Sequence, residues 1–130
     1  MTTTDVYSST ALGATDAVNV SPVKTTLSAT TTAIVLNAKL TLGKSQPGRS
    51  NSPRLYFAVS PFSVAAADAR ATFRPVASYL DLVPAPDSSS ASTVMQTDPI
   101  FNNGGYLYTW IDTPALGAAA ALDAKLVEIN

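Results

Sequence analysis

The clearest pattern along the chain is the alternation of apolar and polar residues over Ala33–Leu42. A period of two residues is typical of a strand that buries one face. The same alternation recurs over residues 54–60, and Pro61 then interrupts it. Both segments therefore predict strands, and the apolar positions of the first are Ile34, Leu36, Ala38, Leu40 and Leu42.

Weaker signals predict further strands. A threonine-rich stretch at residues 23–30 suits a pleated sheet because threonine is β-branched. Additional strands are predicted at residues 79–83, 93–96, 106–111 and 118–129. The last of these is ambiguous, since its four consecutive alanines favour a helix, but Leu122 and Leu126 alternate with charged residues and favour a strand.

The connecting segments carry signals of their own. The alanine run at residues 65–67 predicts one or two helical turns or an irregular connection. Asn102, Asn103, Gly104 and Gly105 form the strongest turn signal in the chain. Short strands joined by Gly, Pro, Ser and Asn loops, with no long helical period, predict an all-β fold, an antiparallel β-sandwich or a jelly-roll-like variant.

The first 22 residues have a different character from the remainder. They are rich in Thr, Ser and Ala, and Val6, Tyr7, Val18 and Val20 are their only larger apolar residues apart from Met1 and Leu12. Apolar residues at intervals suit a segment that lies along another surface, although a loose terminus has the same composition. We predict an extended N-terminal arm over residues 1–22 and a single β-sandwich domain over residues 23–130.

Composition narrows the possible functions. The chain has no Cys and no His, which excludes disulfides, thiolate zinc sites and Ser-His-Asp catalysis. No calcium-loop spacing of Asp residues occurs. We therefore expect no enzymatic activity, no cofactor and no metal. No apolar run approaches the length of a membrane span, and residues 1–10 contain neither the basic nor the apolar region of a secretory signal. We therefore expect an aqueous compartment and no membrane partner.

Sparse charge suggests that neighbours cover much of the surface. Charged residues make up 13% of the chain and the net charge is −1, so a free monomer has little electrostatic repulsion. The first half is basic, with Lys44, Arg49 and Arg54 in or beside one predicted loop, and the second half is acidic. The two halves either neutralise each other within the fold or let the basic loop dock on an acidic patch of another subunit. Nucleic acid is disfavoured as a partner, because the chain is acidic overall.

Aromatic residues supply the other candidate surface. Tyr106, Tyr108 and Trp110 fall on one face of a predicted strand. Aligned aromatics stack on sugar rings or anchor protein interfaces, but aromatics in strands also close hydrophobic cores. The full set of candidate interface residues is Val6, Tyr7, Val18, Val20, Lys44, Arg49, Arg54, Tyr106, Tyr108 and Trp110.

The chain resembles the small all-β virion proteins of tailed bacteriophages, particularly capsid cement or decoration proteins. The resemblance rests on the Thr/Ser-rich first 22 residues, the strand at Ala33–Leu42, the GGYLYTW segment at residues 104–110 and the KLVE segment at residues 125–128. It implies a jelly-roll or similar sandwich, often trimeric, that is made in the host cytoplasm and binds the major capsid protein on the virion surface. The alternatives are a tail, fibre or adaptor component of the virion, and a carbohydrate-binding module that uses the three aromatics.

Overall fold

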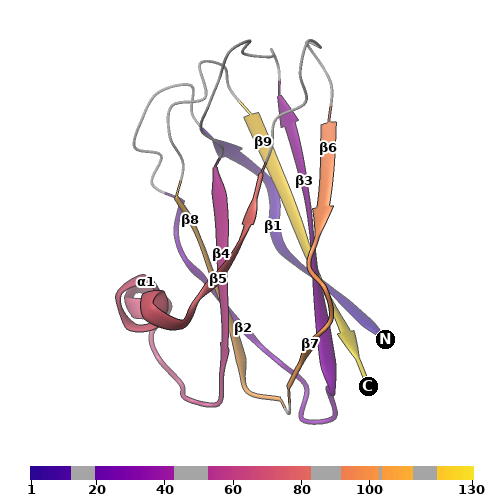
Figure 1. Cartoon of the computed structure of the whole chain (residues 1–130), viewed down its shortest axis with the longest axis vertical. Helices are drawn as coiled ribbons and strands as arrows, with labels where there is room; N and C mark the ends of the chain where they lie inside the picture. Colours follow the sequence, from indigo (N-terminus) through magenta and orange to yellow (C-terminus); the bar gives the residue numbers. More distant parts are fainter. Residues whose placement is uncertain (13–19, 43–52, 83–91, 103, 113–119) are drawn as a thin grey trace.

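The computed structural model of the chain describes residues 1–12, 20–42, 53–82, 92–102, 104–112 and 120–130. Two antiparallel sheets face each other (Figure 1), which confirms the predicted all-β sandwich. The first sheet has the order β1 (Thr2–Leu12), β9 (Ala120–Ile129), β3 (Ala33–Leu42) and β6 (Ser92–Gln96), and β7 (Ile100–Phe101) also pairs with β3. The second sheet has the order β2 (Val23–Thr26), β8 (Tyr106–Asp112), β4 (Arg54–Ser60) and β5 (Ser78–Asp81).

The strand pairings are nested along the chain. The first strand pairs with the last, β2 pairs with β8, β3 pairs with β6 and β7, and β4 pairs with β5. The strands β6 and β7 lie along the same edge of β3, opposite residues 37–41 and residues 33–34. Between them, Thr97 forms two hydrogen bonds with Leu36, each 3.0 Å long. The Thr97 N–H donates to the Leu36 carbonyl, and Thr97 Oγ1 accepts from the Leu36 N–H. The two short strands therefore act as one interrupted edge strand.

The core lies between the sheets and is built by the residues that the alternation indicated. Ile34, Leu36, Ala38 and Leu40 of β3 are all buried. They meet buried leucines of β9 in the same sheet and Leu55 of β4 in the opposite sheet. The strands β3 and β4 have the predicted bounds, and β2 is shorter than predicted. The segment that forms β9 is a strand, as predicted, and not a helix.

The N-terminus differs from the predicted arm. Thr2–Leu12 form β1, which pairs with β9 at the edge of the first sheet. Val6, Tyr7 and Leu12 are buried in the core of this same chain, so the surface along which the segment lies is its own sheet. The register shifts between Asp5 and Tyr7 and again before Thr10. Such irregularities break the two-residue period, and the sequence therefore lacked a strand pattern here.

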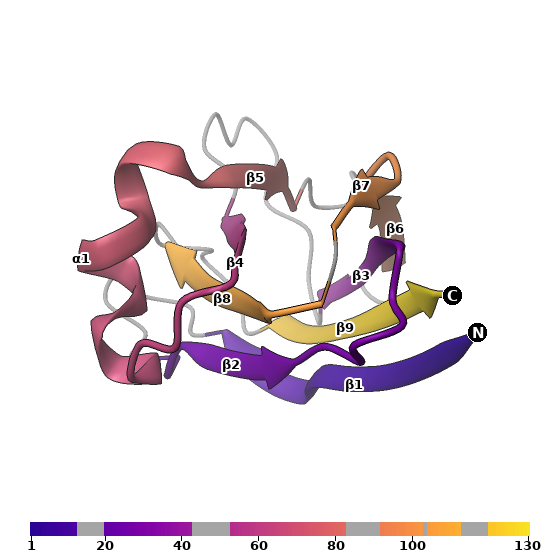
Figure 2. The ribbon, with the colours of Figure 1, turned by 90° about the horizontal axis from the view of Figure 1, so that it is seen from below.

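A short helical segment follows β4, as the alanine run indicated. It consists of η1 (Ala66–Asp68), α1 (Ala69–Phe73) and η2 (Arg74–Val76). Figure 2 shows α1 beside the second sheet, on the side away from β3 and β9. Ala69 and Phe73 of α1 pack there against Ala58, Tyr108 and Trp110 and form a second, smaller hydrophobic cluster. None of the helices in the described residues is long and apolar enough to cross a membrane.

Candidate functional site

The predicted aromatic face exists, but α1 and the loop before it cover most of it. Tyr108 and Trp110 are 0% exposed, and only Tyr106 is partly accessible. The Phe73 ring stacks on Tyr108 with centroids 4.5 Å apart, and the Tyr56 ring stacks on Trp110 at 5.7 Å. The prediction of a binding surface is therefore wrong for Tyr108 and Trp110, which close a hydrophobic cluster instead.

Hydrogen bonds explain why the loop stays over these rings. The Tyr108 hydroxyl donates to the Phe62 carbonyl over 2.7 Å and accepts the Val64 N–H over 2.8 Å. At the accessible end of the face, the Lys24 ammonium lies 4.5 Å from the Tyr106 ring centroid and donates to Ser63 Oγ. A phenol that tethers two backbone groups of one loop has a structural role and leaves no ring face for a sugar.

The other candidate interface residues do not gather into one site. Val6 and Tyr7 are buried core residues, and Val20 packs against the same core from a half-buried position. Arg54 is exposed, forms an ion pair with Asp81 at 3.3 Å and lies over the Tyr79 ring. The remaining candidates lie outside the described residues: Val18, Lys44 and Arg49.

The ion pairs connect the two oppositely charged parts of the sequence. Arg54 meets Asp81, and both Arg70 and Arg74 meet Asp112, at 3.0 and 3.2 Å. Each of these pairs joins a basic residue of the first part to an acid of the second part. At these residues the basic and acidic parts of the sequence neutralise each other within the fold, which was the first of the two hypotheses.

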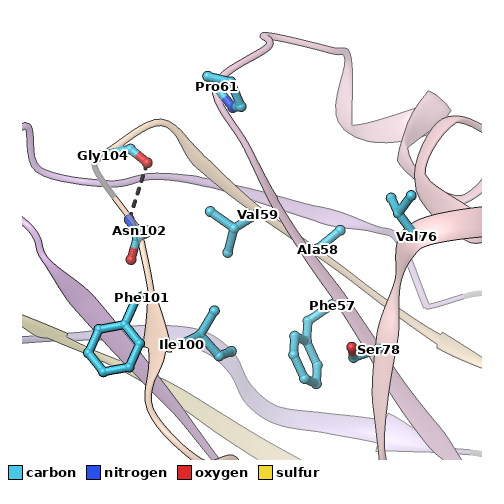
Figure 3. Close-up of a pocket in the computed structure, with 10 residues that line it drawn as sticks. All are labelled: Phe57, Ala58, Val59, Pro61, Val76, Ser78, Ile100, Phe101, Asn102 and Gly104. Carbon is cyan, nitrogen blue, oxygen red and sulfur yellow. Dashed lines mark hydrogen bonds between the residues drawn. The ribbon is translucent and has the colours of Figure 1, made fainter.

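A pocket that the sequence did not indicate lies between β4 and β7 (Figure 3). Its volume is about 440 Å³, and none of the described residues that line it is charged. Figure 3 shows the side chains of Phe57 and Val59 from β4 gathered with Ile100 from β7. All three belong to the main core but are only partly buried, so the pocket is an opening into the sandwich interior.

The pocket exists because β5 begins late relative to β4. Its first residue, Ser78, pairs with Phe57, and the preceding residues form η2, which contains Pro75. Proline has no N–H to donate to a sheet, and the 3-10 turn of η2 is not extended, so pairing with β4 begins only after it. In the described part of the chain, residues 58–60 of β4 consequently pair with β8 on one side and with no strand on the other.

The rim of the pocket is unusually apolar and contains one unsatisfied polar atom. Phe101 is 83% exposed and Val76 is 74% exposed. The Asn102 amide donates to the Gly104 carbonyl over 3.2 Å (Figure 3). Its carbonyl oxygen, Oδ1, is buried and has no hydrogen-bond partner within the residues that the structure describes. Buried polar atoms are normally paired, so this oxygen is an exception among the described residues.

The site could not be predicted from the sequence because β7 is only two residues long. Ile100 and Phe101 are adjacent apolar residues between Pro99 and the Asn-Gly turn. Neighbouring residues of a strand point to opposite faces of the sheet. When one face packs on the core, one of two consecutive apolar side chains therefore points to the surface. That signal was present, but a pair of residues is too short to show a period.

The chemistry available at the pocket is the binding of neutral, apolar groups. The described lining offers hydrocarbon, backbone groups, the Ser78 hydroxyl and the Asn102 carboxamide. Over the described ranges, no three His, Cys, Asp or Glu residues come together as a metal site would require. A scan of the chain against models of known protein families finds no match, and a search of curated proteins finds no relative.

Proposed function

We propose that the protein is a non-enzymatic structural protein of a virus particle, namely a capsid cement or decoration protein that binds the shell of major capsid protein and stabilises it. The observation that carries the proposal is the nested pairing of β1 with β9, β2 with β8, β3 with β6 and β7, and β4 with β5. This is the pairing of one long antiparallel hairpin wound into two sheets, and we take it as a jelly roll. Jelly rolls are frequent among viral capsid domains and lectins.

Surface chemistry supports a role in an assembly. Large apolar residues at Phe62, Val76, Val94 and Phe101 are each more than 70% exposed. Charges are sparse, and several are already paired with each other inside the chain. Cementing requires burial of surface at repeated positions of a shell and no chemistry, and repeated contacts make weak individual contacts effective.

The test is whether the protein occupies virus particles. We would purify particles from the cells that carry this sequence, strip peripheral proteins with mild denaturant and add back the purified chain. Cosedimentation in a fixed ratio to the major capsid protein, with density on the outer shell by electron cryomicroscopy, is the expected result. Absence from particles contradicts the proposal, and density confined to the tail supports the tail or adaptor alternative.

A carbohydrate-binding role is favoured by the proposed jelly roll but not by the aromatic residues first considered. Because Trp110 is buried, Trp110→Ala would destabilise the protein and would say nothing about sugar contacts. A glycan array with the intact protein separates the two functions. Saturable binding to one class of glycan supports a carbohydrate-binding module at another surface, whereas shell occupancy without glycan binding supports the cement role.

A further inference from the structure

The second sheet is incomplete where the pocket lies. Arg54, Leu55, Tyr56 and Phe57 of β4 have strands on both sides, whereas residues 58–60 have only β8 within the described chain. The position that a longer β5 would fill is the pocket itself. An unpaired strand edge presents N–H and C=O groups that another chain is able to pair with.

The polar groups at the pocket match a peptide backbone. Within the described chain, residues 58–60 of β4 have no strand on one side, and that edge calls for both donors and acceptors. The described lining residues carry no charged side chain, so they favour a neutral ligand over an ionic one. An extended peptide supplies donors and acceptors together at a regular spacing, which a lipid chain does not.

The apolar groups fit alternate side chains of such a peptide. Phe57, Val59 and Ile100 form the floor of the pocket, and Val76 and Phe101 stand exposed at its rim. Three residues in extended conformation span roughly 10 Å, enough to lie opposite residues 58–60. Every second side chain of that strand would point to the interior, where small apolar groups complete the core.

We propose that this groove accepts an extended, uncharged segment of a neighbouring protein subunit, which pairs with β4 at residues 58–60 and completes the second sheet. The identity of the donor as a subunit of the same particle rests on the function proposed above. The strand-accepting groove itself rests only on the geometry of β4, β5 and β7.

The experiment titrates isotope-labelled protein with a synthetic probe, acetyl-Thr-Val-Thr-Val-Thr-amide, followed by amide chemical shifts. We expect saturable shifts centred on residues 58–60 and on Asn102. The same peptide N-methylated at both valines lacks two N–H donors and should bind at least tenfold more weakly. Val76→Lys and Phe101→Ala should each weaken binding about tenfold, the scale typical of an interface anchor.

Matched controls are available on the same surface. Val94 is 71% exposed and Phe62 is 74% exposed, and neither lines the pocket. Val94→Lys and Phe62→Ala should therefore leave the affinity unchanged. All four substitutions are at exposed positions, and an unchanged amide spectrum outside the mutated residue shows that each variant is folded.

Three outcomes would overturn the proposal: no saturation at millimolar peptide, equal affinity for the N-methylated peptide, or shifts that map away from β4. Equal affinity would mean that the groove takes apolar groups without strand pairing. The titration uses no virus particle, so its failure leaves the shell-occupancy test untouched, and absence from particles leaves the groove result standing.

Discussion

At the residue scale, the turn before β8 depends on Gly105. Its φ is +88°, and a Cβ there would lie 2.7 Å from the Ser60 carbonyl oxygen. Gly104 also has a positive φ, +74°, but a Cβ there meets its nearest atoms at 3.4 Å, an ordinary contact. We expect Gly105→Ala to cost roughly 2–4 kcal/mol of unfolding free energy, and Gly104→Ala roughly 1–2 kcal/mol. Urea unfolding measures both, and equal losses would contradict the predicted backbone clash.

A second residue-scale prediction concerns pH. The Tyr7 hydroxyl is buried and donates to the Thr109 carbonyl over 3.3 Å. Burial raises the pKa of the Tyr7 phenol, and the Thr109 side chain and the Arg70 charge only partly offset that effect. A raised pKa in the folded state means that the stabilisation is complete below the unfolded value of about 10 and is lost as the pH rises through the folded value.

Tyr7→Phe therefore has two expected effects. At pH 8 the variant should lose about 1 kcal/mol, the usual worth of one hydrogen bond. Above pH 10 the wild type should lose stability faster than the variant, so the difference between them should shrink. Urea unfolding of both proteins at pH 8 and at pH 11 measures this difference in unfolding free energy. A difference that grows with pH would contradict a raised pKa of the buried Tyr7 phenol.

The same scale shows what single residues reveal in the sequence. The alternation identified four core residues, because every second side chain of a regular strand points to the same face of the sheet. These residues are Ile34, Leu36, Ala38 and Leu40. The same alternation placed Tyr108 and Trp110 on one face of their strand. Whether that face is exposed to solvent depends on Phe73 and Ala69, which belong to a separate element, α1, and pack against it. No local pattern around β8 contains that information.

At the element scale, β1 is part of the fold and not an appendage. Three of its side chains, Val6, Tyr7 and Leu12, are buried, and each such burial is worth roughly 1.5–3 kcal/mol. Their sum approaches the whole stability of a small domain, about 5–15 kcal/mol. We expect deletion of residues 1–12 to leave the protein unfolded or aggregated, since it also uncovers the edge of β9.

Circular dichroism melting and size-exclusion chromatography measure the effect of that deletion. Thr3→Ala is the control, because Thr3 is exposed on the same strand and should change little. A deletion variant that melts cooperatively near the wild-type temperature would show that these residues act as the detachable arm predicted from composition.

Elements with a regular period were predictable, and irregular ones were not. The bounds of β3 and β4 followed from alternation, and β9 followed from its leucines despite the alanine run. Register shifts concealed β1, and the shortness of β7 concealed the outer wall of the pocket. The pocket itself depends on where β5 begins relative to β4, which is a property of pairing and lies outside any single segment.

At the scale of the whole molecule, sparse charges that pair with one another on the surface leave a weakly charged exterior with exposed apolar residues. Arg54, Arg70 and Arg74 are each paired with an Asp from the later part of the sequence. Exposed apolar residues lie on several separate elements, including Val94 on β6, Phe101 on β7 and Val76 on η2. Isolated apolar residues are ordinary on surfaces, but their combination with sparse charge favours association.

We expect the purified chain to self-associate, with a trimer as the favoured state. Light scattering over a concentration series should give about three times the chain mass of 13.4 kDa. Because the contacts expected are apolar, the mass should persist in 1 M salt, where charge pairs are screened within about 3 Å. Val94→Lys and Phe62→Lys place a charge on two different elements, and the variant that dissociates identifies the contacting one. A mass of one chain at every concentration would contradict self-association, and the exposed apolar residues would then be available only to a different protein, such as a shell subunit.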